Sequence, residues 1–233
     1  MRKKQKIYKK DIKIIIPVFN EEKTIGKLLD KMKKLGWISN VICVNDGSKD
    51  KSNEIIQKYP VEYLEHSINR GLGGALRTGI EAALILDAKI IVTMDADLQH
   101  KPEEIEQIVK PIKDSKADVV IGSRIQDKEG MPFIRRVANR IGNLVTKILF
   151  SINVSDSQSG FRAFSNKAAK KIDLQTSRME ISSEIISQIK KQDLKLVEVP
   201  ISAVYSDYSL SKGQGLKTGI KTMIKLMIAR FKW

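Results

Sequence analysis

The chain has 233 residues and a mass of 26.3 kDa, and 42% of its residues are hydrophobic and 30% charged. This mixture is typical of a globular domain in water, and it excludes a disordered tail, a collagen-like fibre and a protein with many membrane spans. The only cysteine, Cys43, excludes an internal disulfide and favours a reducing compartment. The formal net charge of +15 points to an anionic partner, either nucleic acid or a membrane surface.

The positive charge is concentrated at the two ends of the chain. Residues 1–10 contain six Lys or Arg and no acid, and six more follow Asp207 without an acid, so the ends supply 12 of the 15 net charges. We interpret residues 1–10 as a basic N-terminal arm and residues 213–233 as a basic amphipathic helix. Such a helix can lie in a membrane interface, but its apolar side can equally pack on the domain.

Short β-branched runs alternate with segments of helical period along the first half of the chain, which is typical of parallel βαβ units. These runs show little polar alternation, so both faces of the predicted sheet should be covered by helices. Strands are predicted at residues 12–18, 41–45, 61–66, 90–94 and 118–122, and helices at residues 21–35, 51–58, 72–86 and 102–113.

The second half is predicted to be more helical. Apolar residues recur at helical spacing in three segments, which are separated by two short β-branched runs. The predicted helices are residues 134–149, 178–191 and 216–231, and the predicted strands are residues 161–164 and 196–201.

No apolar run in the sequence approaches the ~20 residues that a membrane-spanning helix needs. The run at residues 14–19 follows basic residues, as in a signal peptide, but Pro17 and the polar residues 20–22 cut it short. We therefore expect a cytoplasmic protein.

Ligands bind beyond the carboxyl ends of the strands in an open parallel sheet, so the residues that follow each strand are the candidate site residues. Asp95 and Asp97 follow the fourth predicted strand, with Gln99 close behind. Two carboxylates at this spacing suit a hard divalent cation such as Mg²⁺ or Mn²⁺, completed by water or phosphate oxygens. An isolated Asp-x-Asp pair also occurs in solvated turns and helix caps. The polar ends of the neighbouring strands favour the metal here.

The segment at residues 69–75 contains three glycines and opens a predicted helix, where it could bind a phosphate. It lacks both the spacing of a dinucleotide-binding loop and the Gly-Lys-Ser/Thr of a P-loop. Close packing of the backbone around a neighbouring site is an equally good explanation of the glycines.

Taken together, six short motifs resemble those of the family 2 inverting glycosyltransferases of GT-A fold. Within this family the chain is most similar to the polyprenyl-phosphate glycosyltransferases, the dolichol-phosphate mannose synthase group. The motifs are PVFNEE (17–22), VNDGS (44–48), NRGLGGA (69–75), DADLQH (95–100), IGSR (121–124) and SGFRAF (159–164). The resemblance implies an α/β GT-A domain at residues 11–212, with a mainly parallel, Rossmann-like sheet flanked by helices. Residues 11–124 would be its nucleotide-sugar half and residues 125–212 its acceptor half.

The resemblance also implies roles for individual residues, each at a position that matches a family motif. The residues implied to bind the nucleotide-sugar donor are Pro17, Phe19, Glu21, Val44, Asp46, Asp95, Ala96, Asp97 and Lys212. Those implied to hold the Mg²⁺ or Mn²⁺ ion are Asp95, Asp97 and Gln99. Those implied to bind the acceptor phosphate are Arg135, Asn139, Ser159 and Arg162. Asp95, Asp97 and Arg124 are the expected catalytic residues, with Glu184 as a candidate base.

The expected function is metal-dependent, inverting transfer of a hexose from a GDP- or UDP-sugar to a polyprenyl phosphate. The enzyme would act peripherally at the inner face of the cell membrane, where its basic ends would meet anionic lipid, and a membrane partner protein could complete the acceptor site. A phosphate acceptor is already ionised near neutral pH, so it needs no strong base.

Other functions remain open at this point. A glycosyltransferase acting on a hydroxyl acceptor would need a base, for which Glu184 is the candidate, although a charge on a helix surface explains this residue as well. The low aromatic content of 6% and the absence of a nucleic-acid motif argue against a nucleic-acid-binding protein. The intact set of Asp95, Asp97 and Gln99 argues against an inactive homologue.

Overall fold

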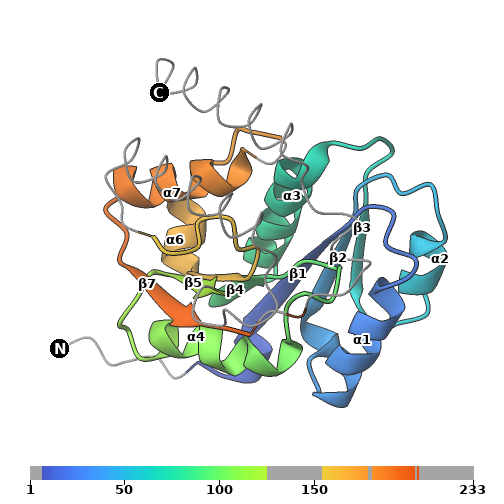
Figure 1. Cartoon of the computed structure of the whole chain (residues 1–233), viewed down its shortest axis with the longest axis horizontal. Helices are drawn as coiled ribbons and strands as arrows, with labels where there is room; N and C mark the ends of the chain where they lie inside the picture. The colour runs from blue at the N-terminus through green and yellow to red at the C-terminus, as the bar shows by residue number, and fades with distance from the viewer. Residues whose placement is uncertain (1–6, 125–153, 178–179, 203, 205–233) are drawn as a thin grey trace.

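One mixed sheet forms the centre of the molecule (Figure 1), and its strand order is β3-β2-β1-β4-β6-β5-β7. The computed structural model describes residues 7–124, 154–177, 180–202 and 204. The strands are β1 (Ile12–Val18), β2 (Val41–Asn45), β3 (Glu62–Glu65), β4 (Ile90–Thr93), β5 (Val119–Ser123), β6 (Arg162–Ser165) and β7 (Leu196–Pro200). All of these strands were predicted to within two residues at either end.

Only β6 runs against the other strands of the described residues. It pairs antiparallel with both β4 and β5, whereas the remaining pairs are parallel. The prediction of a mainly parallel sheet is therefore confirmed. Because β6 is reversed, the residues that precede it lie at the same edge as the residues that follow β4 and β5.

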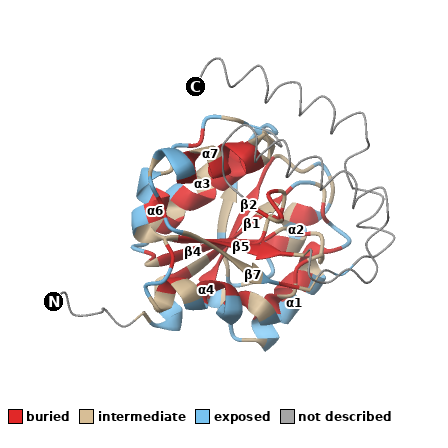
Figure 2. Ribbon diagram, turned by 60° about the vertical axis from the view of Figure 1, so that its left-hand side comes forward, coloured by how far each residue is buried: buried red, intermediate tan, exposed pale blue. Residues whose placement is uncertain are grey.

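Helices cover both faces of the sheet (Figures 1 and 2). On one face lie α1 (Ile25–Lys34), α2 (Ser52–Ile56) and α4 (Ile105–Lys113), and on the other lie α3 (Gly71–Ile85), α6 (Asn166–Lys171) and α7 (Ile181–Lys191). Short 3₁₀ turns occur at Lys9–Asp11, Ile38–Asn40 and Pro102–Glu104. The predicted helices 134–149 and 216–231, and most of the basic arm, lie outside the described residues.

The alternation of side chains along a strand explains why two cores form. Ile14 and Ile16 of β1 pack with α1 and α4, whereas Ile15 between them packs with α3, and all three are fully buried. Each buried side chain of this size contributes roughly 1.5–3 kcal/mol relative to an exposed one. The central strands are therefore apolar on both faces, as the sequence predicted.

The helices begin and end slightly differently from the predictions. The helix predicted from residue 21 begins at Ile25, because residues 21–24 form a turn in which the Glu21 carbonyl accepts a hydrogen bond from the Thr24 amide. The short helix α6 was not predicted. Its N-cap is Ser165, whose hydroxyl accepts a hydrogen bond from the Ala168 amide.

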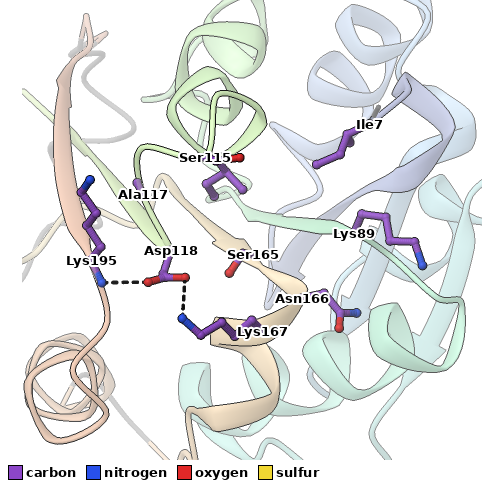
Figure 3. Close-up of a pocket in the computed structure, with 10 residues that line it drawn as sticks. Ile7, Lys89, Ser115, Ala117, Asp118, Ser165, Asn166, Lys167 and Lys195 are labelled. Carbon is purple, nitrogen blue, oxygen red and sulfur yellow. Dashed lines mark hydrogen bonds and ion pairs between the residues drawn. The ribbon is translucent and has the colours of Figure 1, made fainter. Parts of the chain in front are cut away.

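An open cavity of about 370 Å³ lies at the edge of the sheet where the parallel strands begin (Figure 3). Asp118 lines it and joins the starts of two neighbouring strands. Its carboxylate accepts a hydrogen bond from the Lys195 amide (3.0 Å) and pairs with the Lys167 ammonium (3.2 Å). None of the six sequence motifs reaches this cavity, so the candidate site lies at the opposite edge.

Among the helices in the described part of the chain, none is both long enough and apolar enough to cross a bilayer.

Candidate active site

The two most specific motifs of the sequence meet at the carboxyl edge of the sheet. Asp95 follows β4, and Gly160 precedes the reversed strand β6. The Thr93 hydroxyl donates a hydrogen bond to the Gly160 carbonyl (2.8 Å). The Asp95 carboxylate packs directly against Gly160, where an added Cβ would lie 2.6 Å from its Cγ atom. Glycine is therefore required at position 160 for the carboxylate to occupy this place.

Asp95 and Asp97 form an electrostatically unfavourable pair in the absence of a cation. Burial raises the pKa of Asp95, and the nearby Arg124 and Arg162 offset this only in part. Burial, followed by repulsion from Asp95, raises the pKa of Asp97. The Asp95 side chain remains 40% exposed, so a ligand can reach it. The positive charge of a bound cation would stabilise both ionised carboxylates and so lower the pKa values of Asp95 and Asp97.

The donor atoms of this pair fit a hard divalent cation. Carboxylate oxygens are the ligands that Mg²⁺ and Mn²⁺ prefer. Gln99 lies with the pair, since its backbone amide (3.0 Å) and side-chain amide (2.6 Å) both donate to the Asp97 carboxylate. In the described ranges, no three His, Cys, Asp or Glu side chains are grouped to hold a metal. Such an ion would need ligands beyond the two carboxylates, such as the Gln99 side-chain oxygen, water or substrate oxygens.

His100 supports the loop that carries the two carboxylates. Its ring is buried, lies 5.3 Å from the Phe161 ring between centroids, and approaches the Asp95 carboxylate to 3.7 Å. Burial lowers the pKa of His100 to about 4, so the ring is neutral near pH 7. His100 therefore packs residues 95–100 against residues 160–161 without adding positive charge.

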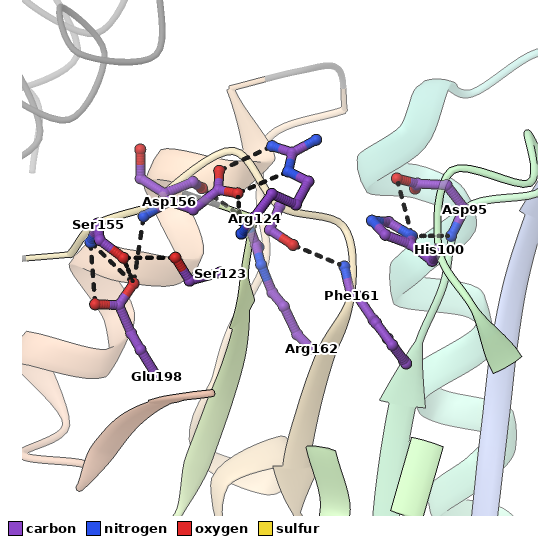
Figure 4. Close-up of polar contacts among 11 residues, drawn as sticks. Asp95, His100, Ser123, Arg124, Ser155, Asp156, Phe161, Arg162 and Glu198 are labelled. Carbon is purple, nitrogen blue, oxygen red and sulfur yellow. Dashed lines mark hydrogen bonds and ion pairs between the residues drawn. The ribbon is translucent and has the colours of Figure 1, made fainter. Parts of the chain in front are cut away.

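Arg124 is fixed by a bidentate ion pair with Asp156 (Figure 4). Its Nε and Nη2 atoms lie 2.6 and 2.8 Å from the two Asp156 oxygens, and its backbone amide donates to the same carboxylate at 3.1 Å. Burial alone would raise the pKa of Asp156, but the Arg124 guanidinium outweighs it and the net pKa is lowered. The arginine is thus held in one orientation.

Arg162 is buried beneath this ion pair, with 2% of its surface exposed. Its Nη2 atom donates to the Ser157 carbonyl (2.9 Å), and its Nε atom is buried without a hydrogen-bond partner. Burial lowers the pKa of Arg162 to about 10, and Asp95 and Asp156 oppose that shift. The guanidinium therefore stays charged near pH 7, and its positive charge stabilises the ionised form of Asp95.

Ser159 is also fully buried, and its hydroxyl accepts a hydrogen bond from the Phe161 amide (3.3 Å). Ser159 and Arg162 were predicted to bind the acceptor phosphate. Both side chains are buried and form hydrogen bonds within residues 157–162, and their binding of the phosphate stays a prediction.

Asp46, which was predicted to bind the donor, organises the start of α3. Its carboxylate accepts hydrogen bonds from the Arg70 and Gly71 amides (2.8 Å each) and contacts the His66 Nδ1 atom (2.7 Å). The His66 Nε2 atom in turn contacts the Thr78 hydroxyl (2.9 Å). Asp46 therefore positions the glycine-rich segment, and close packing explains these glycines. An added Cβ on Gly73 would clash with the carbonyl of Thr176.

Most of the other residues predicted to bind the donor lie in or just after the strands β1, β2 and β4. Pro17 and Val44 are paired neighbours in β1 and β2, and the Val44 side chain is fully buried, so only its backbone could face a ligand. Phe19 is 44% exposed at the end of β1. The Glu21 carboxylate accepts a hydrogen bond from the Thr24 hydroxyl (2.7 Å). Ala96 is buried between the two aspartates.

The loops after β1 and β2 are joined by reciprocal hydrogen bonds. The Asn20 amide donates to the Ser48 hydroxyl (3.0 Å), and the Asn20 side chain accepts from the Lys49 amide (2.9 Å). The Glu22 amide donates to the Asp50 carboxylate (3.0 Å). Partial burial raises the pKa of Asp50, but hydrogen bonds from Ser52 and Glu22 outweigh it, so the net pKa is lowered. The two loops are therefore held together at the carboxyl edge of the sheet.

Glu184 lies in α7 and holds a neighbouring loop. Its carboxylate is 3% exposed and accepts three hydrogen bonds, from the Gln175 amide (2.7 Å), the Thr176 amide (2.9 Å) and the Thr176 hydroxyl (2.6 Å). The same loop packs against Gly73 at the start of α3. These contacts favour a structural role.

The structure adds two acids that the sequence did not single out, Asp156 and Glu198. Glu198 lies in β7 and binds the turn that carries Asp156. Three predicted site residues lie outside the described ranges, namely Lys212, Arg135 and Asn139.

Comparisons with known proteins agree with this arrangement. Residues 13–173 match the model of Glycosyl transferase family 2. The chain is 48% identical over 229 residues to an uncharacterised protein of Methanocaldococcus jannaschii, covering 96% of this chain and 94% of that one. It is 35% identical over 241 residues to the UDP-N-acetylglucosamine–dolichyl-phosphate N-acetylglucosaminyltransferase of Methanococcus voltae, covering 94% and 96% of the two chains.

Among solved structures, the fold matches glucosyl-3-phosphoglycerate synthase from Mycobacterium tuberculosis in complex with Mn²⁺, UDP and glucosyl-3-phosphoglycerate. The TM-score is 0.74 at 16% sequence identity, over 94% of this chain and 79% of that chain. The family model spans well over half of the chain, and the fold agrees with it. The chain therefore belongs to glycosyl transferase family 2 and is a glycosyltransferase of GT-A fold.

Proposed function

We propose that this enzyme transfers a hexose from a GDP- or UDP-sugar to a polyprenyl phosphate, with inversion and with the help of Mg²⁺ or Mn²⁺. The observation that carries the proposal is the contact between residues 95–97 and residues 159–162 at one edge of the sheet. Carboxylates for a cation and two fixed arginines meet there. The name of the Methanococcus voltae relative includes both a UDP-sugar and dolichyl phosphate, which supports the same classes of donor and acceptor.

The proposed reaction is a single displacement. An acceptor phosphate oxygen forms a bond to the anomeric carbon while the bond from that carbon to the nucleoside diphosphate breaks, so negative charge moves onto the leaving diphosphate. A divalent cation held by Asp95 and Asp97 would offset that charge. Arg124, fixed by Asp156, and the buried Arg162 keep positive charge beside the carboxylates without rearranging during the reaction.

A phosphate acceptor needs no proton removed, and the structure offers Glu184 little freedom to remove one. We expect Glu184→Gln to lower the free energy of unfolding by about 1–3 kcal/mol. The glutamine NH₂ group would replace one carboxylate oxygen and could not accept the hydrogen bond that this oxygen now accepts. The pH profile of kcat should be unchanged. Urea unfolding and kcat between pH 6 and 9 test this, with the exposed Glu106→Gln as the control. A large loss of kcat without loss of stability would restore the base role.

The proposed function is tested by a transfer assay. The purified chain is mixed with labelled UDP-N-acetylglucosamine, UDP-glucose or GDP-mannose, MnCl₂ or MgCl₂, and polyprenyl phosphate in detergent. We expect label to enter the organic phase with one of these donors and to stay in water when EDTA is added. Hydrolysis or transfer only to a hydroxyl acceptor would replace the proposal by the hydroxyl-acceptor alternative. Failure to bind any sugar nucleotide would contradict a donor site at this edge.

The proposed acceptor lies in a membrane, and the basic ends of the chain suit an anionic surface, worth about 1 kcal/mol for each nearby Lys or Arg. We expect deletion of residues 215–233 to remove most binding to vesicles that contain anionic lipid. Flotation with neutral vesicles is the control, and high salt should mimic the deletion. Equal flotation of the two proteins would contradict the proposed membrane role of this segment.

A further inference from the structure

Glu198 is an acidic residue in the middle of the edge strand β7, on the face of the sheet that also carries the buried Arg162, since both residues pair with Ile121 of β5. Its neighbours Val197 and Val199 pack into the core on the α4 side, and the alternation of the strand puts Glu198 on the other side. A charge there is unfavourable unless hydrogen bonds satisfy it. The hydrogen-bond partners of Glu198 lie at the candidate active site.

The Glu198 carboxylate binds one turn of the chain, residues 155–157 (Figure 4). It accepts hydrogen bonds from the Ser155 amide (2.9 Å), the Ser155 hydroxyl (2.8 Å) and the Asp156 amide (3.3 Å). Because the Ser155 hydroxyl donates to Glu198, it accepts from the hydroxyl of Ser123, 2.7 Å away, the residue before Arg124. One carboxylate thus connects the edge strand, the turn and the end of β5.

The same turn holds both arginines of the site. The Asp156 side chain forms the bidentate pair with Arg124, and the Ser157 carbonyl accepts the hydrogen bond from Arg162. These two guanidinium groups are the positive charges that act on Asp95. A shift of the turn would therefore move the positive side of the site as a unit.

We propose that Glu198 is a positioning residue for sugar transfer: it fixes the 155–157 turn and, through Asp156, the orientation of Arg124 at the candidate site. This inference rests on the proposed site but not on the identity of the acceptor. Glu198 lies behind the turn and need touch no substrate itself.

The first measurement compares Glu198→Gln with a matched control, Asp118→Asn. Asp118 also joins β5 to β7 by accepting an amide hydrogen bond, but at the opposite edge of the sheet (Figure 3). We expect Glu198→Gln to lower kcat/KM about 10- to 100-fold, because small displacements of positioned groups have effects of this size. Asp118→Asn should leave kcat/KM unchanged even where it lowers the melting temperature.

A double-mutant cycle with Arg124→Lys separates positioning from general support of the fold. Lysine keeps the charge but cannot form the bidentate pair. If Glu198 acts through Arg124, Glu198→Gln will have little further effect on kcat/KM in the Arg124→Lys protein. The same factor of loss in both backgrounds, or an unchanged kcat/KM for Glu198→Gln, would overturn the inference.

Ser155→Ala provides a second variant should Glu198→Gln fold poorly. It removes the hydroxyl links to Glu198 and Ser123 and leaves the backbone hydrogen bonds. We expect Ser155→Ala to lower kcat/KM less than Glu198→Gln does, and to have little effect in the Arg124→Lys protein. The same factor of loss with Arg124 and with Lys at that position would count against the inference. All constants are measured with whichever acceptor the wild-type enzyme uses. A wild type active only on a hydroxyl acceptor would thus overturn the proposed function while the cycle still tests Glu198.

Discussion

Asp97→Asn should reduce kcat/KM for sugar transfer by about 100- to 1,000-fold, the range seen when a preorganised electrostatic contact is removed from an active site. The substitution removes one of two carboxylates that offer oxygen ligands to a cation, and Gln99 cannot replace the lost charge. Initial rates over a range of donor and metal concentrations measure the effect. A higher metal requirement should accompany the loss of rate.

The same substitution should not destabilise the metal-free protein. The pKa of Asp97 is raised in the folded state by burial and by Asp95, so its ionised form opposes folding near pH 7. A neutral side chain removes that penalty, and the free energy of unfolding should stay level or rise. Asp87→Asn, at an exposed position away from the site, is the control. A loss of activity that merely follows a loss of stability would contradict this account of Asp97.

Asp156→Asn should lower both stability and activity. The carboxylate is 1% exposed and Arg124 is 13% exposed, so the substitution leaves a largely buried guanidinium without its partner. Breaking a buried pair in this way costs about 3–5 kcal/mol. Urea unfolding at pH 7 should show this loss, whereas Asp118→Asn, whose partner Lys167 is exposed, should cost about 1 kcal/mol or less.

The effect of Asp156→Asn should depend on pH in a defined direction. Asp156 has a lowered pKa in the folded state, so its contribution to stability is present above the ordinary aspartate pKa of 3.8 and is lost as the pH falls through the folded value. The difference in unfolding free energy between wild type and variant should therefore be constant near neutral pH and shrink below pH 3.8. A difference that persists unchanged in acid would show that packing, and not the ion pair, is responsible.

Much of the fold could be predicted from the sequence, because its central strands are short, mainly apolar runs and most of its helices have a clear polar side. The direction of β6 could not, since a run of four residues contains no signal for its orientation. The helix α6 was missed because six residues are too few to show a helical period, although Ser165 is a good N-cap residue.

The candidate site was predictable where its residues directly follow strands. Asp95, Asp97 and Arg124 lie where the rule for parallel sheets places ligand-binding residues. Asp156 and Glu198 could not be found in this way, because each is a single acid whose partners are 32 and 43 residues distant in the chain. The base role of Glu184 stays a prediction, and the amides of residues 175–176 that donate to its carboxylate could not be recognised from the sequence, because backbone donors carry no residue-type signal.

The ion pair between Arg124 and Asp156 has a consequence for how such an enzyme can change. These two residues are the near ends of the long connection between β5 and β6, and their contact closes that connection at its base. The entropy of closing a chain segment grows slowly with its length, by about 0.6 kcal/mol for each doubling. Because this ion pair holds the two ends together, a change in the number of residues between them would add little to the entropic cost of closing the connection. Under the proposed function, the pair would be a junction at which a new acceptor preference could be grafted onto the nucleotide-sugar half.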